Sequence, residues 1–479
     1  MSENRTGLAR AMGRTDIIAL GFGTMVGWVW IILITTWLTQ AGFWGTIIAF
    51  AAGIGVILLI GMAYGELTSA LPLFGGEMVY AYRAVGLKFS WAVGWTMVLA
   101  YLGVAVWEGI ALASALDYLL PIPDSIFLWE VAGEPVYLSW ALVGAAGGLV
   151  MMFLNLFGTK PAIIFQVMAT IVIIGMGIMM LLGGISFGSV ENIGSGFKDV
   201  SGVFYVMLLM PSMLIGFEVI PQSAEEMNIG GRDIGKMMIV CIVISSIWYL
   251  MIIISVGLGA PEEVRGSGEL PALDVCAYIF GNEKFATILI WVGLLGILTS
   301  WNGFFRGASR LIFAMGRARM IPKVFATTGR RFNTPWVAVL VVGIICMLAM
   351  LMGKSVLNWM VNTSSACALF SYCCVAFSCV ILRIKEPELQ RPFRAGKSIA
   401  APLIIFIMTI IYFVIYIVNA SSQEEYHPAI AVIAVWFIFG IILNLGCHRS
   451  NGKISREERE HLIFGDKLAR RLQDREAQK

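Results

Sequence analysis

Long apolar stretches with almost no charge follow one another along this chain. Each has about the 20 residues that an α-helix needs to cross the hydrocarbon core of a bilayer. None shows the segments of roughly ten strictly alternating residues that are typical of membrane β-barrels. The pattern predicts an all-α membrane protein with twelve transmembrane helices, at residues 17–41, 43–65, 88–117, 136–157, 161–184, 202–226, 237–260, 285–313, 334–353, 356–382, 399–420 and 428–447.

Composition agrees with a membrane protein, and charge predicts its orientation. The chain is 59% hydrophobic and 13% charged, whereas soluble domains carry about 25% charged residues. Cytoplasmic loops are enriched in Lys and Arg. With the N-terminus inside, the only basic residues left outside are Lys198, Arg265, Lys284 and Lys354. We therefore expect a multi-pass protein of the cell (inner) membrane with both termini cytoplasmic, whose net charge of +3 reflects topology and not nucleic-acid binding.

Two of the predicted helices contain residues that interrupt a helix. The first carries three glycines and two tryptophans in "GFGTMVGWVW", residues 21–30. The sixth carries two prolines and a glycine in "MPSMLIGFEVIP", residues 210–221. Non-helical backbone at membrane depth is tolerated only where it is buried in protein or lines a cavity. Close packing of helices through small residues is the alternative explanation for Gly23 and Gly27.

Paired interruptions in corresponding halves indicate an inverted repeat with a binding site near the bilayer midplane. The breaks lie five helices apart, so the second half enters the membrane from the opposite side. Half-helix N-termini would present N–H groups to an anion, and carbonyl ends would suit a cation. We expect a secondary transporter with a cytoplasmic N-terminal segment (1–16), two five-helix repeats (17–184 and 202–382), helices eleven and twelve (399–447) and a cytoplasmic tail (448–479).

Other classes of protein fit less well. An enzyme would need a nucleophile, base and orienting group, or a metal cluster, and no such combination is visible. A substrate-sensing receptor on the same fold would normally bring a large soluble domain. A channel needs a continuous pore, whereas paired broken helices suit alternating access.

Five motifs together resemble the amino acid/polyamine/organocation transporter superfamily. They are "GFGTMVG", "AYGELTSALPLFGGEMVYAYRAVG", "SWAVGW", "GFEVIPQSAEEMNIGGRDIGK" and "NGFFRGASRLIFAMGRARMIPKVF", in this order along the chain. The resemblance implies a twelve-helix, five-plus-five inverted repeat with substrate held between the broken first and sixth helices. It implies an ion-coupled symporter or exchanger of an amino acid or related organocation.

The first break departs from the family pattern. There the family usually continues through a further glycine into Gly-Ile-Phe, in a turn whose N–H groups commonly hold a substrate carboxylate. This chain has Trp28, Val29, Trp30 and Ile31 instead. Because indole faces attract cations, the alternative substrate is a small amine without a carboxylate, such as a polyamine, ethanolamine or a choline-like compound. The tryptophans are otherwise interpreted as interfacial anchors.

The candidate substrate site combines both breaks with two residues of the third helix. Glu108 and Glu218 are ionisable side chains at membrane depth, which are functional candidates by default. Glu218 has a second interpretation, as a structural hydrogen-bond partner of the unwound backbone. The site is expected to contain Gly23, Thr24, Met25, Val26, Gly27, Trp30, Trp107, Glu108, Gly216, Phe217 and Glu218, with no catalytic residue.

The coupling ion is expected to be Na⁺ or H⁺, with no other cofactor. The fifth-helix lysine of some family members is missing, because Ile173 aligns with it. Thr299 and Ser300 resemble the hydroxyl pair of sodium sites in neurotransmitter:sodium symporters, where carbonyls at Gly23 and Val26 would add oxygen ligands that hard cations prefer. Hydrogen bonding across helices is the alternative role for these hydroxyls.

The remaining predictions concern the two ends of the molecule. Glu66, Glu77 and Arg83 are expected to form a gate or an ion network with basic residues near the eighth helix. Residues 261–284 are long enough for short helices. The last two helices are expected to contact the lipid bilayer or a second copy in a homodimer.

Overall fold

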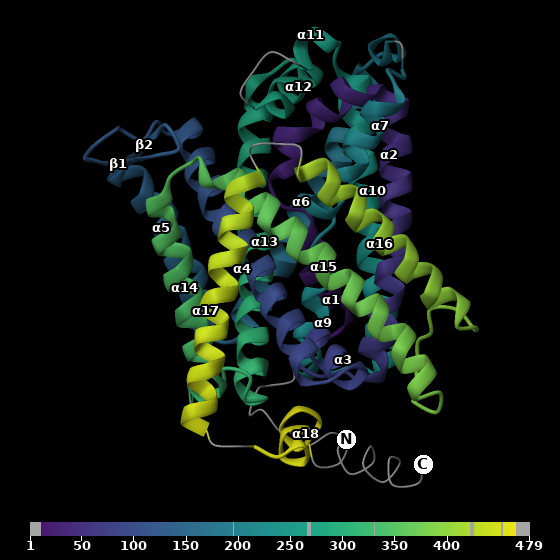
Figure 1. Ribbon diagram of the computed structural model, residues 1–479. Helices are drawn as coiled ribbons and strands as arrows, with labels where there is room; N and C mark the ends of the chain where they lie inside the picture. Colours follow the sequence, from purple (N-terminus) through teal and green to yellow (C-terminus); the bar gives the residue numbers. More distant parts are fainter. Residues whose placement is uncertain are drawn as a thin grey trace.

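The computed structural model describes residues 11–194, 196–265, 270–329, 331–421, 426–451 and 454–465, and these are mostly helical (Figure 1). The elements of the first half are α1 (Arg14–Met25), α2 (Val29–Ala70), α3 (Gly76–Ala84), α4 (Leu87–Leu119), β1 (Phe127–Val131), β2 (Glu134–Tyr137), α5 (Leu138–Leu156), α6 (Thr159–Phe187) and η1 (Val190–Ile193). Predictions that fall on residues 1–10 and 466–479 lie outside the described residues.

The second half continues the helical bundle. Its elements are α7 (Val200–Leu208), α8 (Met210–Met213), α9 (Val219–Gln222), η2 (Ala224–Glu226), α10 (Gly231–Gly259), α11 (Glu262–Arg265), α12 (Pro271–Phe280), α13 (Glu283–Arg317), η3 (Lys323–Ala326), α14 (Trp336–Ala349), η4 (Met350–Met352), α15 (Val356–Lys385), α16 (Ala400–Ser421), α17 (His427–Asn451) and α18 (Arg456–Phe464).

Nine helices in the described part of the chain are long and apolar enough to cross a membrane. The longest, α2, has 42 residues. At 1.5 Å per residue it would measure about 63 Å, roughly twice the hydrocarbon core of a bilayer. It bends at Gly42, whose φ of +76° is a left-handed conformation that interrupts the helix. Two apolar segments therefore lie within this one element.

Both predicted interruptions are present. The chain leaves helical geometry after Met25, and α2 begins only at Val29. The sixth predicted helix is divided into the short pieces α7, α8 and α9, and Gly216 between the last two has a φ of +132°. Only glycine adopts such an angle without strain. The second break is thus encoded by a glycine whose backbone angle does not fit a regular helix.

Burial separates central helices from peripheral ones. In the apolar window of α4, 94% of residues are buried, against 11% in that of α17. In Figure 1, α16 and α17 lie on the outside of the bundle. Both helices expose large apolar side chains, such as those of Ile411 and Ile442. Helices α4, α13 and α15 therefore form the core around which the breaks are packed.

Short elements cover the two ends of the bundle. The β1–β2 hairpin, α11 and α12 lie at one end, called here the α12 end, and α3 and α18 lie at the other, the α3 end (Figure 1). The prediction of short helices within residues 261–284 is confirmed by α11 and α12. Pro271 stands in the first turn of α12 and Gly281 ends it with a φ of +62°, which is the usual pairing of residues at the two ends of a helix.

Candidate functional site

The two breaks meet at the hydroxyl group of Tyr249 on α10. This oxygen lies 3.1 Å from the carbonyl oxygen of Met25 and 3.2 Å from that of Met213. Both carbonyls belong to the last residue of a helix, where no later N–H group of the same helix is available. Tyr249 therefore satisfies backbone groups of both breaks and holds them side by side.

Helix α13 passes close to the first break because glycines line the contact. A Cβ atom on Gly23 would lie 3.2 Å from Cβ of Thr299, and one on Gly27 would lie 3.1 Å from Oγ of Ser300. A Cβ on Gly296 would lie 3.0 Å from the carbonyl oxygen of Gly27. These distances are tighter than ordinary contacts, so a larger side chain would require the neighbouring atoms to move. Gly23 and Gly27 therefore serve close packing as well as the break itself.

Glu108 reaches the first break from α4. Its side chain is fully buried, and a Cβ on Gly27 would lie 3.0 Å from its Oε1. Within the described residues neither carboxylate oxygen makes a hydrogen bond of normal geometry, although the hydroxyl of Ser300 and the indole of Trp107 lie beside it. A buried carboxylate is costly unless it is paired or hydrogen-bonded. The arrangement therefore suits a cationic group placed next to Glu108.

The start of α2 lies at the same break. Its N-cap is Trp28, and no side chain caps the N–H groups of the first turn. The N–H group of Ile31 donates to the carbonyl of Trp28 at 3.0 Å. The N–H groups of Val29 and Trp30 have no acceptor within their own helix, and the helix dipole makes this end positive. An anionic group beside Gly27 would be stabilised by these N–H groups and by the positive end of the helix dipole. The first break thus places a carboxylate and an uncapped helix start next to each other.

Glu218 forms its hydrogen bonds within the second break. Its two carboxylate oxygens accept from the N–H group of Gly216 at 3.0 and 2.9 Å, and Oε2 also accepts from the hydroxyl of Tyr372 at 3.1 Å. The hydroxyl of Tyr101 donates to the backbone carbonyl of Glu218 at 3.0 Å. The geometry favours the interpretation of Glu218 as a partner of the unwound backbone.

The tryptophans of the first break pack against neighbouring helices. Trp30 is 2% exposed, and its ring stands edge-on to that of Trp248 with 5.1 Å between centroids. Trp28 lies over Gly293 of α13, where a Cβ would come within 2.6 Å of its ring. Both indoles are buried in the protein, a position that differs from an anchor at the lipid interface.

The other predicted residues lie in the packed wall around the breaks. The hydroxyl of Thr24 donates to the carbonyl of Leu20, one turn earlier in α1, at 2.5 Å. The ring of Phe217 stands edge-on to that of Tyr64 at 5.4 Å. Met25 and Val26 are buried. The structure thus brings residues of both breaks together with Glu108 and Trp107.

Oxygen atoms gather between α1 and α13. Gln166 of α6 lies behind Gly23, where its amide nitrogen donates to the carbonyl of Thr299 at 3.2 Å and its oxygen accepts from Asn302 at 2.8 Å. The hydroxyl of Thr299 donates to the carbonyl of Gly296 at 3.0 Å. The four residues expected to bind an ion line this contact between the two helices: Gly23, Val26, Thr299 and Ser300. Their carbonyl and hydroxyl groups are the kind that fit a hard cation.

Acidic residues of the segment after α9 make ion pairs with α13. Glu226 accepts from the guanidinium of Arg306 and, at 3.1 Å, from Nε of Arg310, and all three side chains are almost fully buried. The hydroxyl of Thr159, at the start of α6, donates to Glu226 at 2.7 Å. The backbone of Met12 pairs with that of residues 226–228. Four segments that are distant in sequence are therefore joined at the α3 end.

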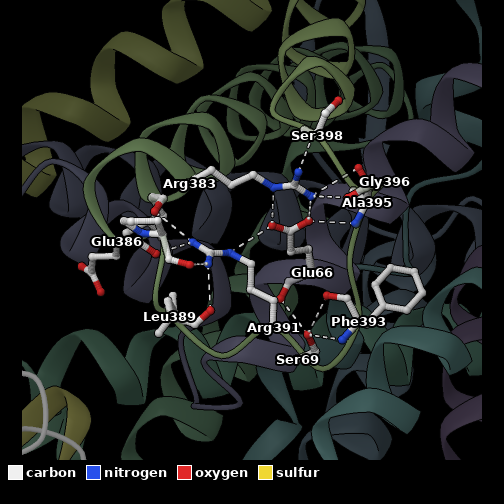
Figure 2. Close-up of polar contacts among 12 residues, drawn as sticks. Glu66, Ser69, Arg383, Glu386, Leu389, Arg391, Phe393, Ala395, Gly396 and Ser398 are labelled. Carbon is white, nitrogen blue, oxygen red and sulfur yellow. Dashed lines mark hydrogen bonds and ion pairs between the residues drawn. The ribbon is translucent and has the colours of Figure 1, made fainter.

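The predicted partners of Glu66, Glu77 and Arg83 are wrong. Figure 2 shows that Glu66 binds Arg383 and Arg391, which belong to α15 and the segment after it and not to the eighth predicted helix; Nε of Arg383 donates to Oε1 at 2.8 Å. Glu77 accepts from Gln222, and Arg83 pairs with Glu386 at 2.6 Å.

The reason is geometric. The segment after α15 folds back over the end of α2, so that the N–H group of Ala395 also donates to Glu66 at 2.8 Å. Nothing in the sequence indicated that the segment after α15 folds back onto α2. Tyr249, Tyr372 and Gln166 were also not predicted as parts of the site, although each is a polar side chain inside an apolar run, which was the available signal.

Comparisons with known proteins agree with this architecture. A model of the amino acid permease family matches residues 13–440. The chain is 23% identical to the branched-chain amino acid permease of Bacillus subtilis (strain 168), over 94% of this chain and 95% of that protein. It is 26% identical to the aspartate-proton symporter of the same organism, over 84% of this chain and 79% of that protein. It is 22% identical to the histidine permease of Lactococcus lactis subsp. cremoris (strain MG1363), over 85% of this chain and 88% of that protein.

The apolar helices and these matches define an integral membrane transport protein, and not an enzyme. The match to the family model spans most of the chain. The protein belongs to the amino acid permease family.

Proposed function

We propose that this protein is a secondary active transporter that imports or exchanges a neutral amino acid by alternating access across the cell membrane. The observation that carries the proposal is the position of Glu108 beside the start of α2 at Gly27. Glu108 is a buried carboxylate that makes no hydrogen bond of normal geometry with the residues that the structure describes. The pair suits both charges of an amino acid. Glu108 would bind the ammonium group, and the first N–H groups of α2 would bind the carboxylate.

This geometry favours an amino acid over an amine that lacks a carboxylate. An amine would use Glu108 but would leave the positive end of α2 without a partner. The substrate side chain is proposed to be uncharged, because Glu218 already makes hydrogen bonds to Gly216 and Tyr372. Names of relatives support the amino acid class, since they include permeases for branched-chain amino acids and histidine.

Charge balance supports ion coupling. A zwitterion beside an ionised Glu108 leaves one negative charge in a buried site, and an added cation would neutralise it. Na⁺ is proposed to bind the carbonyls of Gly23 and Val26 with the hydroxyls of Thr299 and Ser300. In the H⁺ alternative Glu108 itself carries the proton, and a relative named as a proton symporter supports that alternative.

The proposed function also implies a membrane topology. Counting α1 with the first part of α2 as one span, and α7 to α9 as another, gives twelve spans. The first ten are proposed to form a five-plus-five inverted repeat. The α3 end is proposed to be cytoplasmic, because most Lys and Arg residues lie there or in segments that connect to it. Helices α16 and α17 lie outside the repeat and would face lipid or a second copy.

Uptake into proteoliposomes tests the function. The full-length protein should accumulate a labelled neutral amino acid with saturation, and preloaded unlabelled substrate should accelerate entry of the label. A substrate-sensing receptor would bind without flux, and a channel would show neither saturation nor counterflow. Either result would remove the transporter proposal.

A further inference from the structure

Gln166 of α6 packs against the helix that ends at the first break. The residue is 1% exposed, and a Cβ on Gly23 of α1 would lie 2.5 Å from its amide nitrogen. The side chain therefore fills the space that this glycine leaves free. A buried primary amide has two donor hydrogens and an acceptor oxygen, and all of them require partners. The partners of Gln166 show which elements it holds together.

The amide nitrogen of Gln166 joins α1 to α13. It donates to the carbonyl oxygen of Thr299 on α13 at 3.2 Å and to that of Ala19 on α1 at 3.4 Å. The hydroxyl of Thr170, one turn further along α6, donates to the same carbonyl of Ala19 at 3.3 Å. One side chain from a third helix thus links the two helices that meet at the first break.

The amide oxygen of Gln166 belongs to a chain of side-chain amides. It accepts from the amide nitrogen of Asn302 at 2.8 Å, and the oxygen of Asn302 accepts from the amide nitrogen of Asn155 at 3.1 Å. The nitrogen of Asn155 also donates to the backbone carbonyl of Met151 at 3.1 Å. All three amide side chains belong to residues that are at most 2% exposed. The chain runs from α5 through α13 and α6 to α1.

The hydrogen bonds of this chain fix the orientation of the Gln166 amide. If the amide were turned over, its oxygen would face the carbonyl oxygens of Thr299 and Ala19, where no donor is available to it. Its nitrogen would then face the nitrogen of Asn302, which is also a donor. The donation by Asn302 therefore holds the amide nitrogen of Gln166 toward α1 and α13.

The contact that Gln166 holds is the one on which the proposed substrate site depends. A Cβ on Gly27 would lie 3.1 Å from Oγ of Ser300, which follows Thr299 in α13. A change in the spacing of α1 and α13 would therefore move Gly27 relative to Glu108. Packed helices with buried polar links hold one such spacing more precisely than apolar contacts alone.

We propose that Gln166 is a positioning residue for transport, whose amide sets the spacing of α1 and α13 by donating to carbonyls of both helices. It acts through the backbone of these helices and not by contact with the substrate. The inference rests on the proposed function, since the positioned groups are those that would bind the substrate and the coupling ion. Loss of the donor should therefore impair transport by protein that is still folded.

Gln166→Glu tests the donor directly, because it replaces only the amide nitrogen by an oxygen. A protonated carboxyl can still donate one hydrogen bond to these carbonyls, whereas a carboxylate can only accept. Uptake of labelled leucine into proteoliposomes would be measured at about pH 5 and about pH 8. We expect the ratio of kcat/KM, variant to wild type, to fall roughly fivefold or more from the lower to the higher pH. Taking the ratio removes the pH dependence of the wild type.

Three other variants separate positioning from a general effect of charge or folding. Gln40→Glu makes the same change at an exposed glutamine of α2, and its ratio should not depend on pH. Gln166→Leu removes the donor altogether, so its kcat/KM should be low at both pH values. In Asn302→Asp the carboxylate cannot donate to Gln166, which would turn the amide over and also lower kcat/KM at about pH 8. The unfolding midpoint in detergent shows that each variant is folded.

The result that overturns the proposal is a folded Gln166→Glu variant that follows the wild type at both pH values or is impaired equally at both. It is also overturned if Asn302→Asp and Gln166→Leu, both folded, transport like the wild type. Absence of saturable uptake by the wild type would contradict the proposed function and this inference with it. Wild-type uptake with unaltered variants would contradict only the role of Gln166.

Discussion

The carboxylate of Glu108 lies against Gly27, at the point where the chain between α1 and α2 is not helical. A Cβ on Gly27 would be 3.0 Å from Oε1 of Glu108, so a larger residue here would press on the carboxylate. The two residues come from different predicted helices and are 81 positions apart. Their contact places an acid beside exposed backbone, and the proposed binding of an amino acid depends on it.

Glu108→Gln should weaken substrate binding without unfolding the protein. The amide keeps the size of the side chain but loses the charge that would attract an ammonium group, and hydrogen bonds to charged groups contribute about 1.5–3 kcal/mol. Loss of that energy corresponds to a rise in KM for uptake of roughly 10-fold to 100-fold. Glu130→Gln, in the exposed hairpin, is the matched control. An unchanged KM in Glu108→Gln would exclude it as the ammonium partner.

The contact between α1 and α13 predicts the effect of sodium. Removing the hydroxyls in Thr299→Ala and Ser300→Ala should raise the Na⁺ concentration for half-maximal uptake at least tenfold if Na⁺ couples transport. Thr287→Ala, on an outer turn of the same helix, should not change it. Uptake that is indifferent to replacing Na⁺ by K⁺ would contradict the sodium site and leave proton coupling.

The ion network at the α3 end predicts a large loss of stability. Glu226→Gln would leave Arg306 and Arg310 buried without their carboxylate, and breaking a buried pair costs about 3–5 kcal/mol. Glu262→Gln is the control, because Glu262 pairs with Lys198 on the surface at the other end, where such pairs contribute at most about 1 kcal/mol. Unfolding by denaturant in detergent compares the two. Equal losses would show that the buried network is not stabilising.

Glu77 predicts how stability depends on pH. It lies on α3, outside the candidate spans, and burial raises its pKa to about 8, with Glu218 contributing. The folded protein therefore holds this proton over a range where the unfolded chain, with a pKa of about 4.3, has lost it. The contribution of Glu77 to the free energy of unfolding is therefore fully present at low pH, and it is lost as the pH rises from about 4 to about 8. Glu77→Gln should flatten this part of the pH profile, and a slope equal to that of the wild type would contradict the assignment.

Local sequence signals predicted most of the helices and both breaks. The predicted helix at 88–117 is α4 (Leu87–Leu119), and the one at 356–382 is α15 (Val356–Lys385). These signals work because hydrophobic length and glycine or proline act within one segment of chain. Gly216 is an example, since its left-handed φ of +132° interrupts the sixth predicted helix wherever the rest of the chain lies.

Contacts between distant segments were harder to predict. The sequence shows Glu225 and Glu226 as two adjacent acids, but only the fold reveals that Glu226 meets Arg306 while Glu225 meets Arg317. Nor does the sequence reveal that the hydroxyl of Tyr249 hydrogen-bonds to backbone carbonyls at both breaks. Such pairs depend on how helices cross, and one sequence carries no record of that. The partners of Glu66 were assigned wrongly for the same reason.

Thermal stabilisation by matched ligands tests the central claim most directly. The purified protein would be heated with leucine or with 3-methylbutylamine, its decarboxylated counterpart, each with Na⁺ or K⁺. The account predicts that leucine raises the unfolding midpoint and the amine does not, because the start of α2 needs a carboxylate. Stabilisation by the amine alone would contradict it and would assign Glu108 and its aromatic neighbours to a site for amines.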